Sequence, residues 1–177
     1  VMPNYNKEEF IAESVNSIFR QTNPNWELII VDDCSTDNSI KIVSSLSSTN
    51  DKVKLIINSE NRGANYCRNI GIENSSFDWI MFFDSDDVLN KFCVENRIGF
   101  INDNNDKHDF FVFTMKSFEY NLSDNNKLWI PNKKNALNRF LSHNLPWQTM
   151  QTLWFKPSIK KINGFDDSFK RMQDVEI

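Results

Sequence analysis

The sequence predicts an α/β fold in which a doubly wound, mostly parallel sheet of the Rossmann-like type carries helices on both faces. Two observations support this prediction. Short apolar runs rich in β-branched residues alternate with segments whose apolar residues recur at helical spacing. The runs are apolar on consecutive residues, which is typical of parallel strands that helices cover on both faces. The resulting order, β-α-β-α-β-α-β, is that of right-handed crossovers between parallel strands.

The first half of the chain, residues 1–105, supplies this alternation. The second predicted helix is entered through Ser35-Thr36-Asp37, residue types that cap a helix N-terminus. Strands are expected at 1–3, 28–31, 54–58 and 79–83, and helices at 7–21, 40–46, 64–72 and 88–104.

Residues 106–177 follow a less regular pattern. No internal repeat and no linker rich in Gly, Pro or Ser divides the chain, so we expect a single domain over residues 1–177. The chain begins at Val1 without an initiator Met and stops at Ile177 without a closing element, and we expect it to be truncated at both ends. The elements expected here are a strand at 109–118, a polar loop at 121–126, a helix at 135–143, a strand at 151–155 and a short helix from Lys156-Pro157 to Gly164.

The composition excludes several classes of partner. The 177 residues include 20 Lys and Arg against 24 Asp and Glu, so no basic excess is present for binding nucleic acid through its phosphates. The longest apolar run, residues 79–83, is far shorter than the roughly 20 residues of a membrane span. Cys34, Cys67 and Cys93 are widely spaced, which favours reduced thiols. We therefore expect neither a nucleic-acid partner nor a membrane span in this segment.

Acidic residues directly follow two of the predicted strands. Asp32-Asp33 follows the second strand, and Asp84-Ser85-Asp86-Asp87 follows the fourth. Ligands of open α/β sheets bind at the carboxyl ends of strands, and an Asp-x-Asp pair suits a Mn²⁺ or Mg²⁺ ion that also binds phosphates. The alternative is that these acids cap the positive ends of the following helices. At 84–87 the cation is favoured, because the mutual repulsion of three acids needs a counter-charge.

Basic and aromatic residues around the same edge of the sheet leave two interpretations open. Arg62 and Arg68 flank a predicted helix N-terminus beside Gly63, where they can bind an anion or simply be solvated. Tyr5 can stack on a base or cover the edge of the sheet. Trp147, in a loop, is the aromatic residue best suited to contact a sugar, although a core position is the alternative.

A series of short motifs runs through the chain in a fixed order. They are Pro3-x-Tyr5-Asn6, Val31-Asp32-Asp33-x-Ser35-x-Asp37, Asn61-Arg62-Gly63, Arg68-Asn69-x-Gly71, Phe83-Asp84-Ser85-Asp86-Asp87, Gly164-Phe165-Asp166 and Gln173-Asp174. In this order the chain resembles family 2 glycosyltransferases of the GT-A fold over essentially its whole length. Those enzymes transfer a sugar from a nucleoside-diphosphate donor, usually with inversion, and use Mn²⁺ or Mg²⁺. Gln173 is a departure, because the family usually has Glu there.

Carried over residue by residue, the resemblance implies a donor site and a catalytic base. Tyr5 would face the base of the nucleotide, with UDP favoured, and Asp33 would accept a hydrogen bond from the ring N–H. Asp86 would bind the metal ion, with Asp84 on a metal-bound water or the ribose. Asp174 would be the general base that deprotonates the acceptor hydroxyl. The other implied donor-site residues are Pro3, Arg62, Gly63, Arg68 and Ser85, and Trp147 and Gln173 are the acceptor-side candidates.

The expected activity is metal-assisted transfer of a sugar to a hydroxyl group of a glycan, lipid or protein. Residues 1–105 would form the nucleotide-binding half and residues 106–177 the acceptor-side half. We expect this reaction in cell-surface polysaccharide biosynthesis, in the cytoplasm or at the inner face of the membrane.

Two alternative functions stay open. One is a module that binds a nucleotide sugar without turnover, since Gln173 departs from the family pattern. The other is a haloacid-dehalogenase-type phosphatase, because Asp84-x-Asp86 after a strand also matches that motif. A dehydrogenase is disfavoured, because no Gly-x-Gly-x-x-Gly follows any predicted strand.

Overall fold

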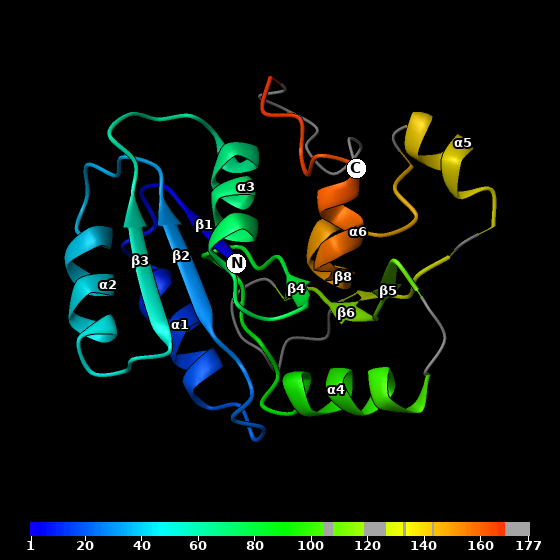
Figure 1. The fold of residues 1–177 in the computed structure, drawn as a ribbon, viewed down its shortest axis with the longest axis horizontal. Coiled ribbons are helices and arrows are strands. Elements are labelled where there is room, and N and C mark those ends of the chain that lie inside the picture. Colours follow the sequence, from blue (N-terminus) through cyan, green and yellow to red (C-terminus); the bar gives the residue numbers. More distant parts are fainter. Residues whose placement is uncertain (105–107, 119–126, 133, 143, 169–177) are drawn as a thin grey trace.

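The computed structural model describes residues 1–104, 108–118, 127–132, 134–142 and 144–168. Strands and helices alternate through the first half of the chain, as predicted (Figure 1). The strands are β1 (Met2–Asn4), β2 (Leu28–Asp32), β3 (Val53–Ile57), β4 (Trp79–Met81), β5 (Phe110–Val112), β6 (Met115–Lys116), β7 (Leu128–Trp129) and β8 (Thr152–Phe155). The helices are α1 (Ile11–Phe19), α2 (Ser39–Ser47), α3 (Ala64–Asn74), α4 (Cys93–Asp103), α5 (Ala136–Leu141) and α6 (Lys156–Lys161), with a 3₁₀ turn at Thr149–Gln151.

The first three strands form a parallel sheet in the order β1-β2-β3. Two further hydrogen bonds extend it beyond β1. The amino group of Val1 donates to the Met81 carbonyl oxygen at 2.8 Å, and the Phe83 N–H donates to the Val1 carbonyl oxygen at 3.0 Å. One residue that bonds in this way to two residues spaced two apart is the pattern of a parallel pair. The segment containing β4 therefore lies beside β1.

β8 continues the sheet with the opposite direction, because it pairs antiparallel with both β4 and β5. The order across the sheet is thus β3-β2-β1-β4-β8-β5. β6 and β7 form a separate two-stranded antiparallel sheet. The predicted doubly wound, mostly parallel α/β sheet is confirmed, with its antiparallel strands confined to one side.

Strand β2 is buried along its whole length, as its consecutive apolar residues predict. Leu28 and Ile30 belong to a core shared with residues of α1 and α2. Ile29 and Val31 point to the opposite face and pack against Cys67 of α3. A third core cluster joins α3, β4, β8 and α6 through Ile72, Ile80, Trp154 and Ile159. These helices on both faces fix the strand ends at which the candidate site lies.

Several expected elements differ in extent from those of the structure, and two of them differ most. The strand predicted at 109–118 is divided, because β5 pairs with β8 whereas β6 pairs with β7 in another sheet. The helix predicted at 88–104 begins only at Cys93, because α1 holds the preceding residues as a loop. In that loop, the Leu89 N–H donates to Ser17 Oγ at 3.1 Å. The last residue of the helix predicted at 135–143 lies outside the described residues.

Candidate active site

A cleft with a cavity volume of about 310 Å³ lies at the carboxyl ends of β1, β2 and β4. The loop after β3 crosses this edge of the sheet to the start of α3 (Figure 1). The residues that line the cleft are Pro3, Asn4, Tyr5, Lys7, Asp33, Ala64, Cys67, Arg68, Asp84, Ser85 and Asp86. Most residues predicted to form the donor site therefore lie together, although they come from separate parts of the sequence.

Asp33 connects the end of β2 to the start of α3. Its Oδ1 accepts hydrogen bonds from the Arg62 N–H at 2.9 Å and from Asn58 Nδ2 at 2.9 Å. Its Oδ2 accepts a hydrogen bond from the Gly63 N–H at 2.7 Å. These backbone donors directly precede α3, where the helix dipole favours a negative charge. Asp33 is only 3% exposed, so these hydrogen bonds hold its carboxylate in the cleft wall.

Asp32 has a structural role, although it is adjacent to Asp33. Its carboxylate accepts hydrogen bonds from Asn4 Nδ2 at 2.6 Å and from both the N–H and the hydroxyl of Ser35 at 2.8 Å. Asp32 is 1% exposed. It thereby fixes the end of β1 to the loop after β2 and does not line the cleft.

The acidic loop after β4 meets two cationic side chains in the cleft. Arg68 Nη2 lies 3.3 Å from Asp84 Oδ1, and Lys7 Nζ lies 2.5 Å from Asp86 Oδ2. Burial, together with the charges of Asp84 and Asp86, raises the pKa of Asp87 to about 7. The loop thus concentrates negative charge, and cations of the protein offset part of it.

Two serines of α1, which no sequence motif singles out, hold this acidic loop in place. Ser14 Oγ donates to the Ser85 carbonyl oxygen at 2.9 Å. Ser17 Oγ accepts a hydrogen bond from the Leu89 N–H at 3.1 Å and donates to the Ser14 carbonyl oxygen at 2.6 Å. Both serines are buried. Their spacing of three residues, within the apolar stripe of the helix, is the signal that could have identified them.

The residues present fit a cation that is shared with a ligand. The side chains of Asp84 and Asp86 are 47% and 40% exposed, respectively, and offer hard carboxylate oxygens to the cleft. Among the described residues, no group of three or more His, Cys, Asp or Glu could hold a metal ion by itself. Mg²⁺ and similar ions typically bind one or two carboxylates, several waters and substrate phosphates. Two acids at an open cleft satisfy that requirement.

Comparison with known proteins places this architecture in a family. The family model "Glycosyl transferase family 2" matches residues 1–160. The chain belongs to glycosyl transferase family 2.

Relatives and solved structures agree with this family 2 assignment. WfgD of Escherichia coli, named UDP-Glc:alpha-D-GlcNAc-diphosphoundecaprenol beta-1,3-glucosyltransferase, is 37% identical over 105 residues, which are 59% of this chain and 41% of WfgD. The crystal structure of Staphylococcus aureus TarS 1–349 in complex with UDP has a TM-score of 0.79 at 23% identity, over 99% of this chain and 52% of that one. The mannosyltransferase PcManGT from Pyrobaculum calidifontis, in complex with GDP-Man and Mn²⁺, has a TM-score of 0.69 at 15% identity, over 98% of this chain and 48% of that one.

The predicted GT-A fold is therefore confirmed for this family 2 chain. The chain spans about half the length, or less, of these relatives.

Five residues assigned to the site in this family 2 chain either do not line the cleft or lie outside the described residues. The Arg62 guanidinium lies 4.2 Å from the centre of the Tyr66 ring, and only the backbone N–H groups of Arg62 and Gly63 serve the site, through Asp33. The Trp147 ring packs against two phenylalanines, Phe110 and Phe140. The remaining pair, Gln173 and Asp174, lies outside the described residues.

Helix α3 also secures the segment that leads toward the predicted base. Asn65 Nδ2 donates to the Asp166 carbonyl oxygen at 2.9 Å, and Asn69 forms two hydrogen bonds with the backbone of Phe165. Asn69 belongs to the motif Arg68-Asn69-x-Gly71 but had no implied role, and no sequence motif contains Asn65. No local pattern marks such residues, because their partners are about 100 residues away.

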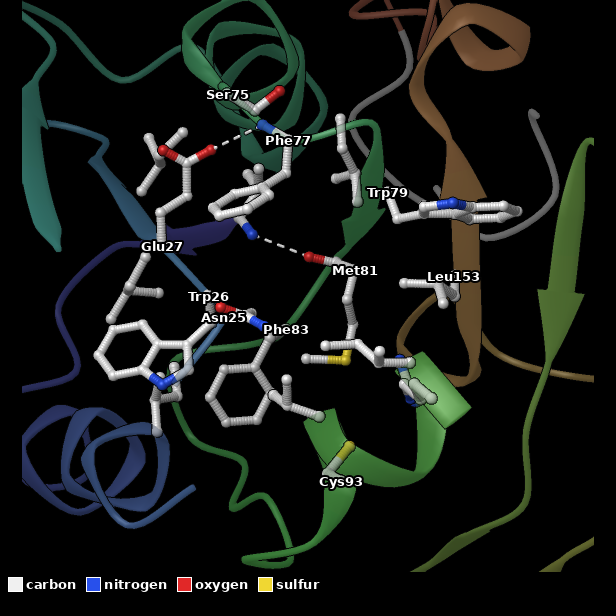
Figure 2. A pocket seen from close by; sticks show the side chains of 18 of the residues that line it. Asn25, Trp26, Glu27, Ser75, Phe77, Trp79, Met81, Phe83, Cys93 and Leu153 are labelled. Atoms are coloured by element: carbon white, nitrogen blue, oxygen red, sulfur yellow. Dashed lines mark hydrogen bonds between the residues drawn. The ribbon is translucent and has the colours of Figure 1, made fainter. Parts of the chain in front are cut away.

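A second cavity, of about 320 Å³, lies at the opposite, amino ends of β2 and β4, beside α4. Figure 2 shows its walls, which include the side chains of Trp26, Phe77, Met81 and Leu153. Its lining is mainly apolar, and its charged members are Glu27, Asp78 and Arg97. Among the described residues, no helix combines the length and the apolar character that a membrane crossing requires.

Proposed function

We propose that this chain is the nucleotide-sugar-binding catalytic domain of a glycosyltransferase that uses a UDP-sugar. The proposal rests on one observation, the convergence of Tyr5, Asp33, Arg68 and Asp86 on a single cleft at the carboxyl ends of the strands. The TarS structures with UDP and with UDP-GlcNAc share this fold and support a nucleotide ligand. The family match also favours sugar transfer over the phosphatase alternative.

The nucleotide would lie between Tyr5 and the start of α3. Tyr5 is 47% exposed just after β1, so a base can stack on its ring. Asp33 would accept a hydrogen bond from the ring N–H of the base, beside Pro3. Arg68 would contribute positive charge to the pocket. Arg68 is 5% exposed, and its guanidinium is held by Asn65 at 3.1 Å and by Asp84 at 3.3 Å. We also retain Arg62, Gly63 and Ser85 as proposed donor-site residues.

Asp84 and Asp86 would hold Mn²⁺ or Mg²⁺ together with the phosphates of the donor. When bound, such an ion would offset the charge that develops on the leaving diphosphate. PcManGT, which shares the fold, is described in complex with Mn²⁺ and a nucleotide sugar. The positions of the two carboxylates would determine where such an ion, and with it the diphosphate, can lie relative to Tyr5 and Asp33.

The transfer itself would need one general base. Asp174 would take the proton of the acceptor hydroxyl while that oxygen bonds to the anomeric carbon and the bond from this carbon to the diphosphate oxygen breaks. This single displacement inverts the anomeric carbon and uses no protein nucleophile. A positioned base typically contributes about 10²- to 10⁴-fold to such a rate. Gln173 and Trp147 are the proposed acceptor-side residues.

The acceptor would be a hydroxyl group of a growing cell-surface glycan or of its lipid-linked precursor. The names of WfgD and of the poly(ribitol-phosphate) transferase TarS, both relatives of this chain, support this class of acceptor. A lipid-linked acceptor would place the reaction in the cytoplasm, at the inner face of the membrane.

Calorimetric titration of UDP, with and without Mn²⁺, tests the proposal on the parent protein, Asp86→Asn and Asp103→Asn. Asp103 is an exposed acid at the end of α4 and serves as the matched control. We expect Mn²⁺-dependent binding in the parent and in Asp103→Asn, and its loss in Asp86→Asn. Absence of UDP, GDP and dTDP binding in the parent would refute the donor site. Binding without turnover of any nucleotide sugar by the full-length protein would instead identify the inactive module.

A further inference from the structure

Lys7 forms an ion pair with Asp86, the proposed metal ligand, and so lies where a metal ion would bind. Its Nζ lies 2.5 Å from Asp86 Oδ2, although 79 residues separate the two in the sequence. The backbone of Lys7 is fixed just beyond β1, because its N–H donates to Ser39 Oγ at 3.0 Å and its carbonyl oxygen accepts the N–H groups of Phe10 and Ile11. The fixed backbone thus brings a flexible, charged side chain to the acidic loop.

The two cationic side chains of the cleft differ in how firmly they are held. Arg68 is 5% exposed, donates to Asn65 and lies 5.3 Å from the centre of the Phe165 ring. Lys7 and Asp86 have side chains that are 37% and 40% exposed. An exposed ion pair contributes little net stability, and a lysine ammonium on a flexible stem can be displaced more easily than a buried guanidinium.

We propose that Lys7 is the resident counter-ion of Asp86, which a divalent cation must displace before it can bind there. The released ammonium then faces the phosphates that arrive with the metal ion. Lys7 thereby lowers the affinity for the metal ion alone and raises the affinity for the nucleotide in its presence. The consequence is that metal and nucleotide bind cooperatively, with Lys7 as the residue that couples them. This inference rests on the proposed function, because it takes Asp86 as the metal ligand.

The charges that face Lys7 are consistent with such an exchange. Asp84, Asp86 and Asp87 are confined to one short loop, with Arg68 on Asp84. With Lys7 on Asp86, the loop is partly neutralised and offers less attraction to a free metal ion. A diphosphate restores the balance, because its negative charge gives the displaced ammonium a new partner.

Mn²⁺ binding, followed by electron paramagnetic resonance of the free ion, tests the first step without any turnover. The variants are Lys7→Met, Lys7→Arg and the control Lys91→Met. Lys91 lies over the Phe92 ring, outside the cleft. We expect Lys7→Met to bind Mn²⁺ alone about two- to fivefold more tightly than the parent, which is the range that an exposed charge pair supports. Lys7→Arg and Lys91→Met should stay close to the parent.

Titration of UDP at saturating Mn²⁺ tests the second step. We expect Lys7→Met to bind UDP about tenfold more weakly, since the phosphates lose a cation. Equal or weaker Mn²⁺ binding by Lys7→Met, or no Mn²⁺ binding by either protein, would overturn the inference. If the parent still shows UDP binding that depends on Asp86 and Mn²⁺, the proposed function survives that result. If the parent binds no nucleotide, the proposed function fails independently of Lys7.

Discussion

Asn69 and Phe165 exchange a pair of hydrogen bonds across 96 residues of sequence. Asn69 Nδ2 donates to the Phe165 carbonyl oxygen at 2.8 Å, and the Phe165 N–H donates to Asn69 Oδ1 at 2.9 Å. The side-chain amide thus pairs with the backbone as a neighbouring strand would. Because Gly164 lies against Asn69 with a positive φ of 72°, the turn before Phe165 favours glycine. The chain that leads to the proposed base is fixed to α3 at this point.

Asn69→Asp should separate nucleotide binding from transfer. The variant keeps the oxygen that accepts a hydrogen bond from the Phe165 N–H. It loses the amide N–H₂ donor, so a second carboxylate oxygen would face the carbonyl oxygen of Phe165. We expect a loss of about 1–3 kcal/mol in the free energy of unfolding in urea. Sugar transfer should fall more than UDP affinity, because Asn69 does not line the donor cleft. Asn96→Asp, at an exposed position of α4, is the control. Equal losses of transfer and UDP affinity would contradict a role on the acceptor side.

Asp174→Asn tests the proposed base directly. The amide keeps the size of the side chain but cannot take a proton from the acceptor hydroxyl. We expect UDP affinity to be unchanged and the transfer rate to fall by about 10²- to 10⁴-fold. Single-turnover transfer by the full-length protein, measured beside calorimetric UDP binding, gives both quantities. A transfer rate equal to that of the parent would remove Asp174 from the base role.

Asp33→Ala should affect both stability and nucleotide binding. The structure shows that Asp33 accepts hydrogen bonds from Asn58, Arg62 and Gly63, so its removal leaves three N–H donors without this acceptor. We expect a loss of about 2–4 kcal/mol in the free energy of unfolding. UDP affinity per folded molecule should also fall, with the Mn²⁺ requirement unchanged. Unchanged affinity in the folded fraction would limit Asp33 to its structural role.

Cys67 should be the unreactive thiol among the three cysteines. Burial, and next the charge of Asp33, raise the pKa of its thiol to about 12. Cys34 and Cys93 are half-buried. A thiol reagent at pH 8 should therefore label Cys34 and Cys93 in the folded protein and label Cys67 only after unfolding. Rapid labelling of Cys67 in the folded state, detected by peptide mass spectrometry, would contradict this assignment.

The same thiol gives a pH dependence of stability. The folded-state pKa of Cys67 is raised, so the folded state retains a proton that the unfolded state releases at a lower pH. Its contribution to the free energy of unfolding is fully present below about pH 9 and is lost as the pH rises toward 12. Cys67→Ala should flatten this decline between pH 9 and 10.5 in urea titrations, whereas Cys34→Ala should not.

The sequence allowed the first half of the fold to be predicted because its signals are local. Consecutive apolar residues such as Ile29 and Ile30 mark a strand that is buried on both faces, and helical spacing marks α1 and α3. The single strand predicted at 109–118 was wrong, because it is divided into β5 and β6 for a non-local reason. β6 pairs with β7 instead of β8, and a pairing choice of this kind is absent from the pattern of a single segment.

The candidate site was predicted where chemistry-bearing residues follow strands. Asp33 and Asp86 are examples, because the ends of parallel strands meet at one edge of the sheet. Sequence pattern could not predict which groups offset their charges. The partner of Asp86 is Lys7, and that of Asp84 is Arg68, each placed there by the tertiary fold. The donor role that the resemblance implies for Arg62 stays a prediction, and its guanidinium lies over the Tyr66 ring.

Ser14→Ala should weaken metal-dependent nucleotide binding without changing any residue of the cleft. Ser14 Oγ is a hydrogen-bond donor to the Ser85 carbonyl oxygen, in the middle of the acidic loop. Without it, that buried carbonyl loses its partner in α1, and the loop can move away from the helix. We expect a loss of about 1 kcal/mol in unfolding free energy. UDP affinity at saturating Mn²⁺ should fall about three- to tenfold, because Asp84 and Asp86 flank the released carbonyl. Ser44→Ala, at an exposed position of α2, should change neither quantity. A Ser14→Ala protein that loses stability but binds UDP and Mn²⁺ like the parent would show that the acidic loop keeps its geometry without α1.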